Sequence, residues 1–225
     1  MLSGHIAPVV TVAFSPDGQQ LATGSVDTTI KLWDLSSGRC LQTFQGHDHS
    51  VWAIAFHPNG HQLASCSYDK TVKLWNLLTG QCIGTFTGHT APIVCLAFSS
   101  NGQQIVSGSY DRTLKLWDTQ TGHLIRTLYG HTKPVYSVLF KASSNSEGGS
   151  TTQNQTANTS SSSDTEDTVV SGSFDETIRF WHVNSGINQR VMRVTRPYEG
   201  MNITRVTGLT NAQKTTLHVL GASKG

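Results

Sequence analysis

The 225-residue sequence contains few charged residues. Asp, Glu, Lys and Arg make up 13% of it, about half the usual share in globular proteins. The formal net charge at pH 7 is +2. Proteins that bind nucleic acids by neutralising phosphates carry a clustered positive charge, so the composition argues against a nucleic-acid partner. It also argues against a highly charged disordered chain.

Long apolar runs, an export signal and metal-ligand patterns are missing as well. No apolar stretch approaches the ~18 residues of a membrane-spanning helix. The first five residues lack the basic and apolar regions of a signal peptide. The four cysteines form no Cys-x-x-Cys pair, and the ten histidines show no zinc-ligand spacing. We therefore expect a cytoplasmic protein that spans no membrane and uses no metal or other cofactor.

A repeat of 42 residues dominates the sequence. A Gly-His pair opens each of four units. A tryptophan follows the histidine after 28 residues in the first three units and after 50 in the fourth, so the fourth unit contains a 22-residue insertion. An aspartate lies six residues before each tryptophan. The histidines are His5, His47, His89 and His131, the aspartates are Asp27, Asp69, Asp111 and Asp175, and the tryptophans are Trp33, Trp75, Trp117 and Trp181.

Within each unit, short stretches of alternating apolar and polar residues are separated by turn residues. This pattern predicts antiparallel strands joined by tight hairpins. The expected strands are 9–14, 21–25, 30–33 and 40–44, then 51–56, 62–67, 72–75 and 82–86, then 93–98, 104–109, 114–117 and 124–128. A sheet this small cannot cover both of its faces, so the sheets must stack. We predict an all-β fold, a β-propeller of four-stranded antiparallel blades.

The Gly-His openings, the Ser-x-Asp turns and endings such as Leu32-Trp33-Asp34 resemble the WD-repeat (WD-40) family. The resemblance covers about residues 4–194. It implies that each blade holds a structural tetrad in which the tryptophan reaches a hydroxyl, the hydroxyl reaches the histidine, and the histidine reaches the aspartate. The candidate hydroxyls lie four residues before each aspartate, at Thr23, Ser65, Ser107 and Ser171. The alternatives, two residues before it, are Ser25, Ser67, Ser109 and Ser173.

Serine, histidine and aspartate also make up nucleophilic triads. Enzymes rarely need four copies of one site, however, so we interpret the repeated residues as structural and expect no catalytic residue. A propeller hydrolase or a metal enzyme is the less favoured alternative.

A ring of side chains is expected on one face of the propeller, where the loops into strand one and between strands two and three emerge. It comprises the residue before each aspartate and the fifth residue after each histidine. Exposed aromatic residues are typical of binding hot spots. The competing interpretation is that they only pack between blades. The predicted partner-binding positions are Trp52, Tyr68, Tyr110, Tyr136 and Phe174, with Val10, Val26 and Val94 completing the ring.

Two segments depart from the repeat. Residues 142–167 are rich in Ser, Thr and Asn, so we expect a disordered insertion between the first two strands of the fourth unit. Residues 195–225 form a tail after the propeller segment 1–194. A capping-box pattern followed by Leu217 and Leu220 predicts a short helix over 211–220. A hairpin that starts a further blade is the alternative.

The tail also resembles the C-terminal end of cyanobacterial-type proteins in which WD repeats follow an NTPase region of the NB-ARC or NACHT kind. The matching stretches are 196–203, 207–213 and 220–222. The resemblance implies the sensor end of a bacterial signalling NTPase, with the NTPase part outside this sequence.

Four units are few for a propeller, because the family usually has seven blades, although four to eight occur. We expect an open or partial ring with bare apolar end faces, covered by a homodimer with eight blades or by missing upstream blades. The predicted function is a non-catalytic scaffold that binds a protein or peptide. A truncated gene product whose blades only mediate self-assembly is the alternative.

Overall fold

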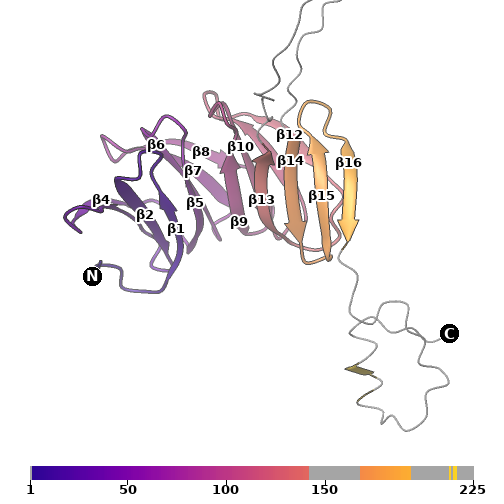
Figure 1. The fold of residues 1–225 in the computed structure, drawn as a ribbon, viewed down its shortest axis with the longest axis horizontal. Helices are drawn as coiled ribbons and strands as arrows, with labels where there is room; N and C mark the ends of the chain where they lie inside the picture. Colours follow the sequence, from indigo (N-terminus) through magenta and orange to yellow (C-terminus); the bar gives the residue numbers. More distant parts are fainter. Residues whose placement is uncertain (1, 142–167, 194–212, 214, 217–225) are drawn as a thin grey trace, which may run out of the picture. The chain divides into compact units, whose positions relative to one another are not determined.

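The computed structural model describes residues 2–141, 168–193, 213 and 215–216. These residues form sixteen strands in four antiparallel sheets, and in each sheet the four strands follow their order in the sequence (Figure 1). We call the sheets blades 1 to 4. The expected all-β architecture of four-stranded blades is confirmed. In the first three units the observed strands begin and end within one residue of the expected positions.

The strands of each blade have similar lengths. Blade 1 consists of β1 (Val9–Phe14), β2 (Gln20–Ser25), β3 (Ile30–Asp34) and β4 (Cys40–Phe44). Blade 2 consists of β5 (Val51–Phe56), β6 (Gln62–Ser67), β7 (Thr71–Asn76) and β8 (Cys82–Thr87). Blade 3 consists of β9 (Ile93–Phe98), β10 (Gln104–Ser109), β11 (Leu114–Asp118) and β12 (Leu124–Leu128). Blade 4 consists of β13 (Val135–Lys141), β14 (Thr168–Ser173), β15 (Thr177–His182) and β16 (Asn188–Arg193).

The first hairpin of blades 1 to 3 turns over a glycine with left-handed backbone. The φ angles of Gly18, Gly60 and Gly102 are 70°, 74° and 72°, a region that favours glycine because it has no Cβ. In blade 4, β13 and β14 pair as far as Lys141 and Thr168. The predicted insertion, residues 142–167, therefore joins the ends of two paired strands; the insertion itself lies outside the described residues.

Three apolar cores hold neighbouring blades together. Between blades 1 and 2, Phe44 packs against Trp75 with ring centroids 5.6 Å apart. Between blades 2 and 3, Phe86 stacks on Trp117 at 5.9 Å. Trp181 contributes to the core between blades 3 and 4. Trp75, Trp117 and Trp181 thus each belong to the core that their own blade shares with the preceding one.

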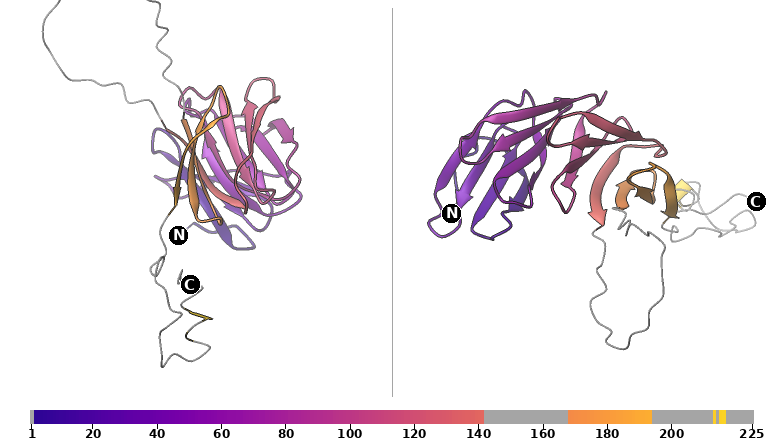
Figure 2. Two further views of the ribbon diagram at one scale, coloured as in Figure 1. Left: turned by 90° about the vertical axis from the view of Figure 1, so that its right-hand side faces the viewer. Right: turned by 90° about the horizontal axis from the view of Figure 1, so that it is seen from above.

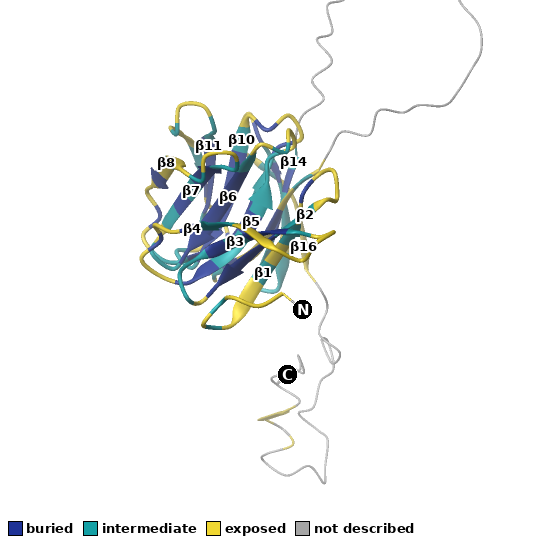
Figure 3. Ribbon diagram, turned by 90° about the vertical axis from the view of Figure 1, so that its left-hand side faces the viewer, coloured by how far each residue is buried: buried dark blue, intermediate teal, exposed yellow. Residues whose placement is uncertain are grey.

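The four blades fan out as an open arc, with the first strands β1, β5, β9 and β13 in contact one with the next (Figure 2). The outer face of blade 1 has no neighbouring blade among the described residues, and β1 is largely exposed there (Figure 3). The expectation of an open ring is therefore confirmed for the described part of the chain.

Residue contacts divide the chain into two units, 1–191 and 192–225. The first contains the blades. The second holds the last two residues of β16 together with Gln213, Thr215 and Thr216, which have helical backbone. The remainder of the helix expected over 211–220 lies outside the described residues, so that helix stays a prediction.

Candidate functional site

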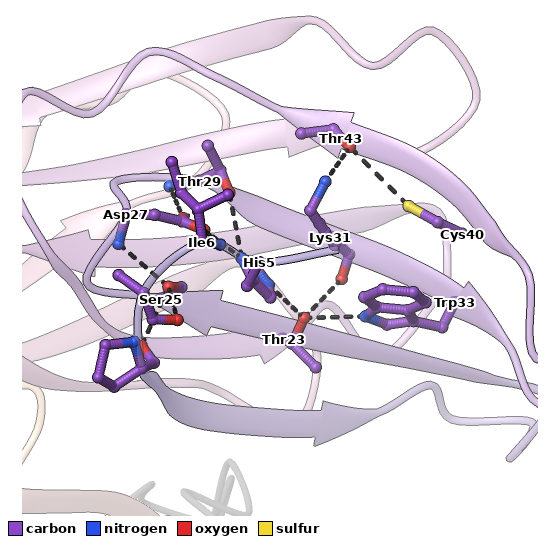
Figure 4. A network of polar contacts seen from close by, with 12 residues as sticks. His5, Ile6, Thr23, Ser25, Asp27, Thr29, Lys31, Trp33, Cys40 and Thr43 are labelled. Carbon is purple, nitrogen blue, oxygen red and sulfur yellow. Dashed lines mark hydrogen bonds and ion pairs between the residues drawn. The ribbon is translucent and has the colours of Figure 1, made fainter. Parts of the chain in front are cut away.

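Each blade contains one chain of side-chain hydrogen bonds, shown for blade 1 in Figure 4. Trp33 Nε1 lies 2.9 Å from Thr23 Oγ1, which lies 2.8 Å from His5 Nε2. His5 Nδ1 in turn lies 2.8 Å from Asp27 Oδ2. The equivalent three contacts in blades 2 to 4 measure 2.6–2.9 Å. The same arrangement of tryptophan, hydroxyl, histidine and aspartate is therefore formed four times, with threonine in blade 1 and serine in blades 2 to 4.

The tryptophan and the aspartate at the two ends of this series of hydrogen bonds limit which groups donate and which accept. An indole N–H can only donate and an ionised carboxylate can only accept. The hydroxyl therefore accepts from tryptophan, and histidine Nδ1–H donates to aspartate. With a neutral imidazole, the hydroxyl also donates to histidine Nε2. In blade 4, burial lowers the pKa of His131 more than neighbouring Asp175 raises it, which agrees with a neutral ring.

The aspartate also fixes the turn that follows it. Asp111 accepts hydrogen bonds from Thr113 Oγ1 at 2.6 Å, Thr113 N at 2.9 Å and Thr90 N at 3.1 Å. Burial raises the pKa of Asp111, but the hydrogen bonds from His89 and Thr113 outweigh it and hold the pKa well below its usual range. The turn contains a non-glycine residue with left-handed backbone, Arg112, at φ 69°. The carboxylate thus ties the loop before β9 to a strained β10–β11 turn.

The sequence left two candidate hydroxyls in each blade, and the geometry gives them different partners. Thr23 contacts the tryptophan and histidine. Ser25 Oγ instead donates to the carbonyl oxygens of Ala7 and Pro8 and accepts from Asp27 N (Figure 4). Both sets of hydroxyls therefore support the same loops, one from the middle of the second strand and one from its last residue.

The tetrad hydroxyls are poorly placed for nucleophilic attack. Ser65 and Ser107 are fully buried, Ser171 is 1% exposed, and each already accepts an indole N–H. A serine nucleophile must instead present its oxygen to a substrate. Among the described residues, no group of three or more His, Cys, Asp and Glu side chains could hold a metal ion. None of the described helical residues belongs to a helix long and apolar enough to cross a membrane.

The tetrads hold two loops of each blade together at one edge of the sheet. Tyr110 N donates to Pro92 O at 2.9 Å, and Phe174 N donates to Pro134 O at 3.1 Å. The same backbone contact joins Tyr68 N to Ser50 O at 3.1 Å. The side chain just before each tetrad aspartate is therefore presented by a backbone that is fixed on both sides.

A β-bulge presents the second ring of side chains. The register between the first two strands shifts by one residue in every blade, and the extra residue is the fifth after the tetrad histidine. Bulges re-aim side chains at the rims of sheets. The bulge residues are Val10, Trp52, Val94 and Tyr136.

The aromatic residues of blades 2 to 4 form one continuous row, which we call the aromatic rim. Trp52 stacks on Tyr68 with ring centroids 4.9 Å apart, and Tyr68 contacts Tyr110 at 5.8 Å. Tyr110 contacts Tyr136 at 5.3 Å, and Tyr136 meets Phe174 edge-on at 4.3 Å. Phe174 is 60% and Tyr136 40% exposed, whereas the other three are half-buried. The row thus crosses the boundary between blades 2 and 3 and the boundary between blades 3 and 4. Its residues pack between blades and are also partly exposed, so the row combines features of a binding surface and of blade packing.

Polar groups run along this aromatic row. Tyr136 OH donates to Tyr110 OH at 2.7 Å, and Tyr110 OH lies 3.1 Å from Tyr68 OH. Burial and the contact with Tyr110 raise the pKa of Tyr68 and Tyr136 to about 12, so both stay protonated at neutral pH. Trp52 Nε1 is buried and has no hydrogen-bond partner among the described residues. The rim therefore offers apolar surface and tyrosine hydroxyls together.

The valines of the predicted ring behave differently from one another. Val10 and Val26 are 37% and 38% exposed. Val94 is only 7% exposed, so it lies at the predicted rim position but contributes little exposed surface. A valine extends less far from the bulge than Trp52 or Tyr136. Val94 also has a blade beside it, whereas Val10 has none before it in the described residues.

Comparison with known proteins agrees with this architecture. The family model of the WD domain, G-beta repeat, matches residues 1–34, 38–76, 80–118 and 122–182. The Notchless protein homolog of Arabidopsis thaliana is 62% identical over 34 residues, which are 15% of this chain and 7% of that protein. The dynein assembly factor with WD repeat domains 1 of Xenopus laevis is 47% identical over 47 residues, 21% of this chain and 11% of that protein.

A third relative is the vegetative incompatibility protein HET-E-1 of Podospora anserina, 60% identical over 37 residues, 16% of this chain and 3% of that protein. The matched region thus spans about a tenth or less of each of these relatives. Four matched repeats, four blades and four hydrogen-bonded tetrads lead to one conclusion: the chain belongs to the WD-repeat family.

Proposed function

We propose that the chain is a non-catalytic scaffold and that it binds a protein or peptide across the aromatic rim. The observation that carries this proposal is the unbroken, partly exposed row from Trp52 to Phe174, which spans three blades. Large aromatic side chains held by a rigid frame lose little conformational entropy on binding and are typical of interface hot spots. WD repeats are typical of protein-interaction scaffolds, and one relative is named as an assembly factor.

The aromatic row suits an extended peptide or a loop with apolar side chains. The rings would supply contact area, and the tyrosine hydroxyls would supply hydrogen bonds to peptide groups. The rim loops and turns carry charges of both signs: Lys70, Arg112 and Lys133 are positive, and Asp48 and Glu176 are negative.

In its finer form, the proposal makes this chain the sensor end of a cytoplasmic, bacterial signalling NTPase protein. The support is the resemblance of residues 196–203, 207–213 and 220–222 to the tails of such proteins. Sequencing the gene upstream of Met1 tests this part. A coding region for an NTPase would support it, and an unrelated upstream gene would contradict it. Neither result bears on binding at the rim.

Peptide selection tests the rim itself. Peptides are selected from a random display library against the immobilised chain, and their affinities are then measured by fluorescence anisotropy. Replacing Trp52, Tyr110 and Tyr136 together with alanine should weaken binding at least ~30-fold, the scale of a lost hot spot, with little change in circular dichroism. Tyr129→Ala is the matched control, because Tyr129 is 74% exposed and outside the rim.

Two results would contradict the proposal. One is a triple variant that binds the selected peptides as tightly as the wild type. The other is a Tyr129→Ala variant that loses as much affinity as the triple variant. A triple variant that fails to fold would favour the interpretation that the rim only packs between blades. In that case, peptide affinity is measured on the milder Tyr136→Phe variant, which removes one hydroxyl, keeps the ring and is expected to fold.

A further inference from the structure

Blades 1 and 4 each carry an apolar face that no described residue covers. On blade 1, Val9, Val12 and Phe14 of β1 are 46%, 58% and 64% exposed (Figure 3). We call this the leading face. On blade 4, Leu139 and Ile178 are 49% and 38% exposed. We call this the trailing face.

The leading face is buried wherever another blade precedes it. The residues equivalent to Val9 are fully buried in all three following blades, at Val51, Ile93 and Val135. The residues equivalent to Val12 show the same contrast. Against 58% for Val12, their exposures are 7%, 8% and 8%, at Ile54, Leu96 and Val138.

The trailing face shows the converse pattern. Ile178 is 38% exposed, whereas its equivalents Ile30, Val72 and Leu114, each of which has a following blade, are 0–1% exposed. The two bare surfaces are therefore the two halves of a contact that the molecule already makes three times. Ile178 matches the residue types at these positions, whereas Leu139 replaces the smaller Ala13, Ala55 and Ala97 of blades 1 to 3.

One glycine position shows how closely the halves fit. A Cβ built on Gly24 would lie 2.9 Å from Val51 Cγ1 of the next blade, and one built on Gly108 would lie 2.8 Å from Val135 Cγ1. The equivalent Cβ on Gly172 would meet only Ser137 of its own blade, at 3.8 Å. The trailing face therefore has free space beside Gly172 at the position where a valine of the next blade packs against Gly24 and Gly108. Val9 of the leading face occupies the equivalent valine position.

We propose that the trailing face of one copy of the chain binds the leading face of a second copy, and that two such contacts close an eight-blade ring. Blades 1 and 4 lie at the two ends of the open arc (Figure 2). A two-fold axis generates both contacts from one surface pair, and eight blades are within the range of known propellers. The inference is independent of the aromatic rim, which lies on a different edge of the blades.

Sedimentation equilibrium of the whole chain tests the ring. The wild type should have twice the 24.4 kDa mass of one chain. Val12→Asp damages the leading face and Leu139→Asp the trailing face, so each variant alone should weaken dimerisation at least ~100-fold. An equimolar mixture should restore a heterodimer with one intact contact and bind at least ~10-fold more tightly than either variant alone. Leu78→Asp is the control, since Leu78 is 93% exposed outside both faces and should leave the dimer intact.

The outcomes separate the possible occupants of the two faces. A wild-type monomer at micromolar concentration would overturn the proposal and point to residues of the same chain, or to blades of a longer one, as the cover. A dimer that Val12→Asp abolishes, that Leu139→Asp spares and that the mixture does not restore would also overturn it. That pattern would indicate two leading faces in contact.

A cysteine pair provides a test that does not depend on affinity. Inside the arc, the valine Cβ lies 3.4 Å from the Cβ built on Gly24 and 3.2 Å from that built on Gly108, near the Cβ separation of a disulfide. Val9→Cys combined with Gly172→Cys should therefore give a covalent dimer under mild oxidation. Each single variant should give only the background of the natural exposed thiols, Cys40 and Cys82. A double variant that stays at this background would overturn the proposed register.

Discussion

Replacing Asp111 with alanine tests whether the tetrads hold the blades together. The carboxylate accepts four hydrogen bonds, from His89 Nδ1 at 2.7 Å, Thr113 Oγ1 at 2.6 Å, Thr113 N at 2.9 Å and Thr90 N at 3.1 Å. The His89 side chain is completely buried, so its N–H would lose its partner where water cannot replace it. An unsatisfied buried donor costs about 1–3 kcal/mol. With the turn contacts added, we expect unfolding to become easier by about 2–4 kcal/mol.

Urea unfolding followed by tryptophan fluorescence measures this loss, since Trp117 belongs to the same tetrad. For a domain of this size, the loss corresponds to a fall in Tm of roughly 5–15 °C. Asp118→Ala is the matched control. Asp118 also accepts hydrogen bonds from a following turn, at Gln120 N, Thr121 N and Thr121 Oγ1, but it faces solvent. We expect a clearly smaller effect there. Equal urea midpoints for the two variants would refute the assignment of Asp111 as a buried structural acceptor.

Three further predictions concern the pH dependence of stability, the glycines at the blade contacts and the insertion. Burial raises the pKa of the four tetrad aspartates, but their hydrogen bonds outweigh it and lower the pKa below the usual range. The unfolded chain therefore binds more protons, and the free energy of unfolding should fall as the pH drops below about 4, the pKa of an unfolded aspartate. Urea midpoints at pH 5 and pH 3 measure this, and a flat profile would contradict it. Gly108→Ala should destabilise by about 1–3 kcal/mol through overpacking, because its Cβ would meet Cys95 Sγ and Val135 Cγ1 at 2.6 and 2.8 Å. Gly172→Ala should be tolerated when the two glycine variants are compared by calorimetry in the Val12→Asp background. Equal losses of stability in the two variants would argue against free space beside Gly172. Replacing residues 142–167 with Ser-Asn-Gly-Gln, the turn of blade 3, should raise stability by up to about 1–2 kcal/mol, because a shorter loop costs less entropy to close. A lower Tm would show that the insertion contributes contacts.

The repeat unit made most of the fold predictable from the sequence. Each strand carries alternating residues between strong turn signals, and four copies in one register leave little freedom for another arrangement. The partners of the tetrad residues could also be anticipated, because the resemblance to the WD-repeat family implies them, and buried polar groups need hydrogen bonds.

Other features depend on contacts that the sequence does not display. The choice between Thr23 and Ser25 is set by strand geometry, since both have the same parity on β2. The bulges at Trp52 and Tyr136 leave no signal in residue type. The burial of Val94 follows from a neighbouring blade, although the same residue type is exposed at Val10. The hydroxyl contacts among the tyrosines depend on side-chain orientations across blade boundaries.

Each blade supplies every hydrogen bond of its own tetrad, and the rim side chains take no part in it. A substitution at a bulge or before a turn aspartate therefore leaves the polar framework of its blade intact. Such positions can change one blade at a time, so a duplicated unit can acquire a new specificity while its copies keep the old one. The same scaffold could accordingly evolve to recognise unrelated partners without ever losing its fold.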